Sequence, residues 1–472
     1  MSWPTIEEMV KKFNSGEVTA EENVLKSFEL IEKGNKYNAI ISVNKDAAIK
    51  LAKEIDQKKK DGKKLGRLAG VPYIAKDNFL TLDLNTTAAS NMLKDYKANY
   101  ESTTTKLLNQ EDAIMVAKAN LDAFAHGTST ENSDFFTTFN PIDVEYVAGG
   151  SSGGSASSVA LDMAPFALGS DTGGSIRLPA SFCGIVGYKP TYGAVSRSGV
   201  VAMASSLDTI GVLTKNVADA ALVQEIITKV DPLDSTTVEI KDGNFSELNP
   251  GKKYKVGILK EHMEGELDPN IKAGVLDTVE KLKAAGHAVE EVSIKDLPLA
   301  LAVYYIVCPA EVASNLSRYD GIRYGHASEE SKDLEDFYLN SRSEGFGAEA
   351  KRRIMIGTHV LSSGYFDAYY NKAQTVRTQL INQFNDAFSN YDFLIGPTSP
   401  STAFKVGEKS KDPLAMYLMD ILTVAINLVG IPAISIPIGE SNKMPFGLQV
   451  MAKQKDDHEL FRFSKEIEGL NG

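Results

Sequence analysis

Residues 148–190 read AGGSSGGSASSVALDMAPFALGSDTGGSIRLPASFCGIVGYKP and decide how the rest of the chain is interpreted. They are dense in glycine, serine and alanine, a composition that often marks a flexible linker. Two apolar runs, at 158–168 and 182–190, interrupt this composition. Glycine next to apolar runs is typical of places where two backbones approach closely. We therefore predict a packed core here and not a linker.

Outward from this segment, short apolar runs alternate with helical patterns. The predicted strands share small or β-branched apolar residues and are VPYIAKD (71–77), AIMVAKA (113–119), KVGIL (255–259), AVEEVSI (288–294), FLIGP (393–397) and AISIPIG (433–439). Helices are predicted between or before them, at 102–112 and 269–286. The strand–helix–strand order favours a mainly parallel arrangement in that region. We expect an α/β protein whose twisted mixed sheet is flanked by helices on both faces.

The first 65 residues are predicted to be mainly helical. Thr5 with Glu8, and Thr19 with Glu22, have the spacing of capping boxes, and a third helix is predicted at 46–60. No repeat or low-complexity linker divides the chain. We therefore predict a single domain over 1–472, with its core at 66–220 and the remaining sheet and substrate-specificity elements at 221–472.

Composition excludes several classes of protein. The formal net charge of −12 is unfavourable for a chain that binds a polyphosphate by itself, so a partner is expected to hold any RNA. The two cysteines form no CxxC, which argues against a disulfide framework or a zinc site, and no metal site is predicted. MSWPTIEEMVKKF lacks the features of a signal peptide. These observations predict a cytoplasmic protein.

The uncharged run at 421–439 is long enough to span a bilayer. However, Gly430, Pro432 and Pro437 interrupt it, and its second half is β-branched. We predict a buried helix that ends near Gly430, followed by a buried strand, and no contact with a membrane.

GGSSGG contains the G-x-S-x-G pattern of a hydrolase nucleophile elbow. That interpretation requires a histidine late in the chain as general base. His262, His287 and His458 lie among charged residues, and we predict them at the surface. Neither glycine-rich segment has the form of a phosphate-binding loop.

A lysine is the next candidate for the base that activates a serine. Lys76 follows the apolar residues 71–75, and loss of hydration at the end of a buried strand favours a neutral amine. Alternatively, Lys76 pairs with the adjacent Asp77 and carries only charge. The local sequence leaves both interpretations open.

Three segments together resemble the amidase signature family. They are GVPYIAKDN (70–78), GGSSGGS (149–155) and GSDTGGSIRLPASFCG (169–184), in the order in which that family has them. Ser151 and Ser175 are 24 positions apart, which matches the family spacing. The resemblance implies that Ser175 is the nucleophile. It also implies that Ser151, after a cis peptide bond, relays protons, and that Lys76 is the base acting through Ser151.

The resemblance also gives a role to the glycines, because attack on an amide creates an oxyanion that backbone N–H groups must stabilise. The predicted oxyanion hole consists of consecutive amides, at Thr172, Gly173, Gly174 and Ser175. We interpret Asp171 and Arg177 as structural residues that orient this loop.

Later segments, at 313–325, 341–358 and 362–377, resemble the glutamine-hydrolysing subunits of glutamyl-tRNA(Gln)/aspartyl-tRNA(Asn) amidotransferases within the same family. The resemblance implies hydrolysis of L-glutamine and transfer of ammonia to a partner, the B subunit. That partner binds the misacylated tRNA and uses ATP and Mg, while a small C subunit completes a heterotrimer. No cofactor is expected in this chain.

By the same resemblance, three residues bind glutamine. Arg353 matches the ligand of the α-carboxylate, Asp420 that of the α-ammonium group, and Tyr304 a further contact. Arg352 is the residue most easily confused with Arg353. His126 stands where the family usually has methionine, and it either faces the substrate or fills the same space.

Three other functions remain open on the sequence. The first is a free-standing amidase that acts on small amides without partners. The second is a non-enzymatic assembly protein with a relic site, and the third is a Ser–His hydrolase that uses Ser151.

Overall fold

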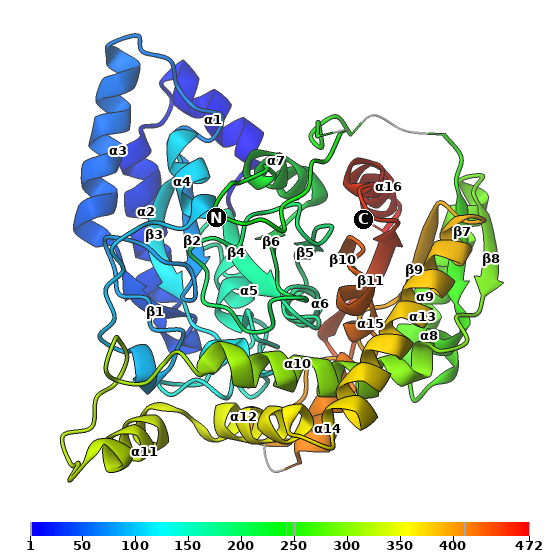
Figure 1. Ribbon diagram of the computed structural model, residues 1–472. Coiled ribbons are helices and arrows are strands. Elements are labelled where there is room, and N and C mark those ends of the chain that lie inside the picture. The colour runs from blue at the N-terminus through cyan, green and yellow to red at the C-terminus, as the bar shows by residue number, and fades with distance from the viewer. Residues whose placement is uncertain (1, 242, 249–251, 410–411, 472) are drawn as a thin grey trace.

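The sheet is the feature that organises the molecule (Figure 1). The computed structural model describes residues 2–241, 243–248, 252–409 and 412–471. Within these residues eleven strands form one sheet in the order β1-β3-β2-β4-β6-β5-β10-β11-β9-β7-β8. The strands are β1 (Ile40–Val43), β2 (Pro72–Lys76), β3 (Ile114–Ala119), β4 (Phe166–Asp171), β5 (Val186–Lys189), β6 (Thr209–Thr214), β7 (Lys255–Leu259), β8 (Ala288–Val292), β9 (Phe393–Pro397), β10 (Ala433–Ser441) and β11 (Met444–Ala452).

The sheet is mixed, as predicted. β2 runs parallel to β3 and β4, and β7 runs parallel to β8 and β9. The other neighbouring pairs are antiparallel. The β5–β10 pair joins strands from the first half of the chain to strands from the second half. The two halves therefore share one hydrogen-bonded sheet.

Helices cover both faces of this sheet, which confirms the predicted fold class. They are α1 (Ile6–Ser15), α2 (Ala20–Lys33), α3 (Lys45–Lys60), α4 (Thr103–Gln110), α5 (Gly153–Ala160), α6 (Arg177–Cys183), α7 (Val217–Ile227), α8 (Lys260–Glu264), α9 (Pro269–Ala284), α10 (Ala300–Leu316), α11 (Leu334–Gly345), α12 (Ala348–Leu361), α13 (Lys372–Phe388), α14 (Pro413–Tyr417), α15 (Val424–Val429) and α16 (Asp457–Asn471). Both predicted capping boxes form, at the starts of α1 and α2.

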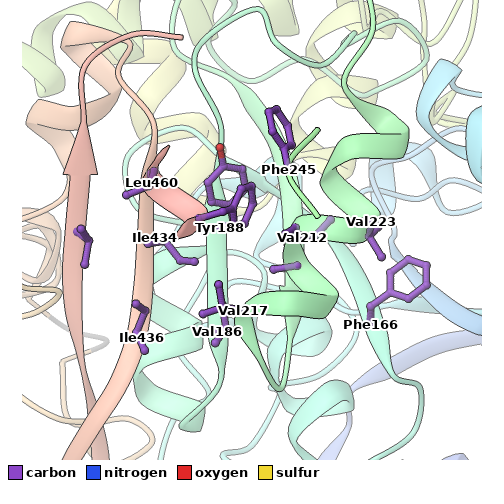
Figure 2. Packing of buried hydrophobic residues seen from close by; sticks show 14 of the residues in the cluster. Phe166, Val186, Tyr188, Val212, Val217, Val223, Phe245, Ile434, Ile436 and Leu460 are labelled. Carbon is purple, nitrogen blue, oxygen red and sulfur yellow. The ribbon is translucent and has the colours of Figure 1, made fainter. Parts of the chain in front are cut away.

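Alternation of side chains along the strands produces a separate core on each face. On β9, Phe393 and Ile395 belong to one cluster of buried residues, whereas Leu394 between them belongs to another. The first cluster lies between the sheet and helices that include α7 and α16, and Figure 2 shows side chains of β5, β6 and β10 packed there. Period-two alternation of this kind is expected for a strand that is buried on both faces.

The apolar run at 421–439 is a buried part of the fold, as predicted. It contains α15, which ends before Gly430, and most of β10. Among the described residues, one helical stretch, Leu297–Leu316, is long and apolar enough to cross a bilayer, and half of it is buried. It includes α10, which packs against α12, α13 and α15.

Helices α10 and α12 run side by side along one edge of the molecule (Figure 1). Their close approach depends on Gly357, because a Cβ atom there would lie 1.9 Å from the carbonyl oxygen of Pro309. The same contact brings Arg353, one turn earlier on α12, to within 3.9 Å (Nη1 to Sγ) of Cys308 on α10. The packing of these helices therefore determines where Arg353 lies.

A buried ion pair fixes the loop that follows β2. The Lys118 ammonium group lies 2.8 Å from Asp77 Oδ1, and both side chains are fully buried. Lys118 also donates to the carbonyl oxygen of Phe79, at 2.8 Å. Asp77 is therefore paired with Lys118 on β3, so the structure does not support the alternative in which it is the charge partner of Lys76.

We expect Lys118→Met to lower the free energy of unfolding by ~3–5 kcal/mol, because it leaves the Asp77 carboxylate buried without its cation. Adding Asp77→Asn should recover part of this loss, since the double variant has no isolated charge. Urea titrations of wild type and the two variants would measure both effects. Equal stability of the single variant and wild type would show that the pair does not hold the loop.

Candidate active site

Lys76 ends strand β2 and is fully buried. Its ammonium nitrogen lies 2.8 Å from Ser151 Oγ and 3.0 Å from Ser170 Oγ. The amine of Lys76 is thus where three separate segments meet. They are β2, the GGSSGGS segment and the end of β4. The structure therefore brings together two of the three residues of the predicted triad by direct contact.

Burial lowers the pKa of Lys76 to about 7, although the nearby carboxylates of Asp122, Asp171 and Asp208 favour the charged form. A substantial fraction of the amine is therefore neutral near neutral pH. A neutral amine 2.8 Å from a hydroxyl can accept its proton. This is the chemistry that the interpretation of Lys76 as a base requires.

Asp122, which sequence reasoning missed, lies beside this group. Its backbone N–H donates to the carbonyl oxygen of Ser151, and its carboxylate accepts from the amides of Thr130 and Asn132 at 2.9 and 3.0 Å. Burial raises its pKa to about 6. No motif around residue 122 indicates this position, because its partners are backbone groups.

Ser151 and Ser175 lie on segments that are in direct contact. The Gly150–Ser151 peptide bond is cis, as the family resemblance predicts. The amide of Ser152 donates to the carbonyl oxygen of Ser175, at 3.1 Å. Ser175 is 8% exposed and Ser151 is fully buried. This packing places the predicted nucleophile next to the predicted relay.

Asp171 and Arg177 form a buried ion pair across the Ser175 loop, with 2.9 Å between Arg177 Nη2 and Asp171 Oδ1. Burial alone would raise the pKa of Asp171, but the charge and hydrogen bonds of Arg177 lower it to about 2, with help from Lys189 and Asn427. The Asp171 carboxylate accepts from the amides of Gly174 and Ile176. The pair therefore orients the loop, as expected from the sequence.

The glycine turn is shaped by close neighbours. Gly174 has φ +141°, and a Cβ atom there would lie 2.3 Å from Thr423 Oγ1. A Cβ atom at Gly173 would lie 2.7 Å from the hydroxyl of Tyr304. Only glycine fits both positions. Tyr304, a predicted substrate contact, thus lies directly against the predicted oxyanion hole.

The amide of Gly174 already donates to Asp171 Oδ1, at 2.9 Å. By contrast, no acceptor among the described residues binds the amides of Gly173 or Ser175. Among the predicted oxyanion-hole residues, Gly174 therefore has an N–H group that is already bound to another residue.

The predicted glutamine ligands lie together near this turn. Arg353 and Asp420 are 3% and 5% exposed. Asp420 Oδ2 accepts from the hydroxyl of Tyr305, at 3.2 Å. Burial raises the pKa of Asp420 to about 8, although the charge of Arg353 acts in the opposite direction. The structure thus places a buried cation and a carboxyl group close enough to interact.

Of the two adjacent arginines, Arg353 and not Arg352 is buried. The side chain of Arg352 is 42% exposed, whereas that of Arg353 is 4% exposed. Both pair with Glu349, which sequence reasoning did not identify. Its position four residues before Arg353 is the only sequence signal that could have suggested the contact.

His126 is fully buried, and neither ring nitrogen has a hydrogen-bond partner among the described residues. Burial lowers its pKa well below the usual value, and the charge of Arg353 acts in the same direction. A neutral imidazole therefore fills this space. The prediction that His262 and His287 lie at the surface is wrong, because they are only 3% and 4% exposed.

A cavity of about 240 Å³ opens beside the lysine. Asn78, Ser170, Thr172 and Asp208 are among its lining residues, and Ser170 is the hydroxyl that binds Lys76. Among the described residues, no group of three or more His, Cys, Asp or Glu side chains is arranged to hold a metal ion.

A family model of amidases matches residues 22–461. The chain belongs to the amidase family. This confirms the resemblance carried by the three motifs.

Within the amidase family, three relatives are informative, and each is the A subunit of a glutamyl-tRNA(Gln) amidotransferase. The protein of Staphylococcus haemolyticus is 47% identical over 469 residues, which are 99% of this chain and 97% of that protein. The protein of Thermoanaerobacter pseudethanolicus is 48% identical over 99% of this chain and 96% of that protein. The crystal structure of the Thermotoga maritima protein has a TM-score of 0.80 and 42% identity, covering 97% of this chain and 93% of that one.

We expect His126→Met to raise the free energy of unfolding by ~1–2 kcal/mol, because it replaces an unpaired buried polar ring by an apolar side chain. The gain should grow as pH falls below about 6.5, by up to ~1.4 kcal/mol per pH unit, since the unfolded wild type then binds a proton that the folded protein excludes. Urea titrations at two pH values would measure it. A loss of stability would show that the ring has a polar partner.

Proposed function

We propose that this amidase is the glutamine-hydrolysing subunit of a tRNA-dependent amidotransferase. The observation that carries the proposal is 46–48% identity to the A subunits of glutamyl-tRNA(Gln) amidotransferases over nearly the whole chain. The buried lysine bonded to Ser151 and the buried side chains of Arg353 and Asp420 support the same activity. The reaction is L-glutamine plus water giving L-glutamate and ammonia.

In the first step, neutral Lys76 accepts the Ser151 hydroxyl proton, and Ser151 takes the proton of Ser175. The Ser175 oxygen then attacks the glutamine side-chain carbonyl carbon and forms a tetrahedral oxyanion. The amides of Thr172, Gly173 and Ser175 donate to that oxyanion, while Gly174 remains bound to Asp171. A lysine whose pKa burial lowers to about 7 is suited to this exchange, because it can both accept and return a proton.

Collapse of the intermediate breaks the carbon–nitrogen bond. Protonated Lys76 returns its proton through Ser151 to the leaving nitrogen, which departs as ammonia and leaves a γ-glutamyl ester on Ser175. Water then attacks the ester with Lys76 and Ser151 again removing a proton. Glutamate is released, and the Ser175 hydroxyl is restored.

Arg353 and Asp420 give this site its preference for an α-amino acid. A guanidinium group binds a carboxylate through a planar fork, and a carboxylate binds an ammonium group. Their charges match the α-carboxylate and α-ammonium groups of glutamine, and Tyr304 adds a contact against Gly173. A neutral aliphatic amide offers neither group a partner of opposite charge, so it gains less free energy on binding.

The ammonia is used elsewhere in the complex. We assign activation of the misacylated tRNA with ATP and Mg to the B subunit, and we place a small C subunit in the heterotrimer. The net charge of −12 agrees with a tRNA held mainly by a partner, because phosphate binding requires cations. The complex would convert Glu-tRNA(Gln), Asp-tRNA(Asn) or both in the cytoplasm.

Replacing the proposed nucleophile should separate glutamine hydrolysis from the amidation of tRNA. We expect Ser175→Ala to reduce ammonia release from glutamine at least ~10³-fold, because no acyl-enzyme forms. The complex should still amidate charged tRNA when free ammonium replaces glutamine. Ser158→Ala, on α5, is the matched control and should keep both activities.

Retained glutamine hydrolysis in Ser175→Ala would refute the assignment of the nucleophile. Vigorous hydrolysis of many aliphatic amides by the wild-type chain, with no stimulation by partner subunits, would instead identify a free-standing amidase.

The pH dependence of Ser175 labelling tests the base. A fluorophosphonate phosphonylates serine with loss of fluoride and carries no α-ammonium group, so Asp420 does not affect the rate at which it labels Ser175. Because the pKa of Lys76 is about 7, the labelling rate should fall about tenfold per pH unit well below that value, where the amine is protonated. Lys76→Met should label slowly at every pH. A rate that does not vary between about pH 5.5 and about pH 8 would exclude Lys76 as the base.

A further inference from the structure

Glu349 on α12 binds two arginines and a tyrosine. Its Oε1 atom accepts from Arg353 Nε at 2.9 Å and from the hydroxyl of Tyr417 at 3.1 Å. Its Oε2 atom pairs with Arg352. One carboxylate thus neutralises one of two adjacent guanidinium charges. Arg352, Arg353 and Glu349 together therefore carry one net positive charge, and of the two arginines Arg353 is the buried one.

The same carboxylate is connected to Asp420 through two aromatic rings. Tyr417 stacks on Tyr305 with 4.0 Å between ring centroids. Tyr305 in turn donates from its hydroxyl to Asp420 Oδ2, at 3.2 Å. The guanidinium carbon of Arg353 lies 5.6 and 5.8 Å from the two ring centroids, within the range of cation–π attraction. Residues from α10, α12, α14 and the turn before α15 therefore form one network.

Opposite charges on buried side chains attract each other strongly, because little water screens them. Although burial raises the pKa of Asp420 to about 8, the charge of Arg353 favours the ionised form, and a direct ion pair between them would occupy the groups needed for a zwitterionic ligand. In the structure Arg353 Nε is instead directed to Glu349, and Asp420 to Tyr305. Each charged group thus has a partner outside the ligand position.

We propose that Glu349 is a positioning residue that keeps Arg353 apart from Asp420, so that both remain available to the two charges of an α-amino acid. It holds the Nε edge of the guanidinium group and leaves the Nη end for the substrate α-carboxylate. Tyr417 fixes Glu349 in turn. The inference rests on the proposed glutamine-hydrolysing function and adds a residue outside the substrate contacts to it.

The test compares Glu349→Gln with wild type, alone or with partner subunits, in whichever form the wild type is active. The variant should raise KM for L-glutamine and the inhibition constant of L-glutamate at least about tenfold, because Arg353 turns toward Asp420. Its kcat should stay within about twofold, and fluorophosphonate labelling of Ser175 should be unchanged, since the triad is untouched. Tyr417→Phe keeps the stacked ring and removes one hydrogen bond, so its KM should rise less.

Glu344→Gln, on α11, is the matched control, because Glu344 pairs with His326 outside this network, and its KM should equal that of wild type. A KM for L-glutamine within twofold of wild type in Glu349→Gln would overturn the proposal. Equal losses of kcat and of labelling rate would also overturn it, because they indicate general damage to the protein. Wild-type protein that neither hydrolyses glutamine nor binds glutamate would refute the proposed function itself. The ratio of KM in Glu349→Gln to KM in wild type therefore tests the role of Glu349 separately from the proposed function.

Discussion

The ion pair between Asp171 and Arg177 holds the site together. Besides Asp171, Arg177 binds Asn427 on α15 and Gln449 on β11, so its partners come from widely separated segments. Both members of the pair are fully buried, and a buried charge without its partner costs several kcal/mol. The loop that carries Ser175 is closed around this pair. Its position therefore depends on packing that extends across the sheet from β4 to β11.

The sequence predicts those parts of the fold whose pattern is local. Continuous apolar runs identify β2 and β3, and the caps identify α1 and α2. By contrast, β1, β6 and β11 are not identified, because glycine, proline or polar residues interrupt their apolar pattern. In β11, Gln449 points to Arg177, and Pro445 and Gly447 lie in the same strand. Their strand conformation depends on pairing with distant segments, which a single sequence does not contain.

Within the site, residues that belong to a motif were predictable, and residues that act through distant contacts were not. Whether Lys76 pairs with Asp77 could not be decided from neighbouring residues, because the answer lies in Lys118 on another strand. His262 was wrongly placed at the surface because its neighbours in sequence are charged, although its own side of α8 packs against β9. Glu349 was missed because its contact with Tyr417 exists only once α14 is placed beside α12.

The residues that we propose activate the nucleophile and those that we propose bind the substrate come from different halves of the chain. Lys76, Ser151 and Ser175 precede residue 220, whereas Arg353 and Asp420 follow residue 300, and the β5–β10 pair joins the two sets. During divergence of such a protein, substitutions in the second half can alter which amide is accepted while the hydrolytic apparatus of the first half is inherited intact. With this arrangement, the choice of substrate can change during evolution without substitutions in the residues that carry out hydrolysis.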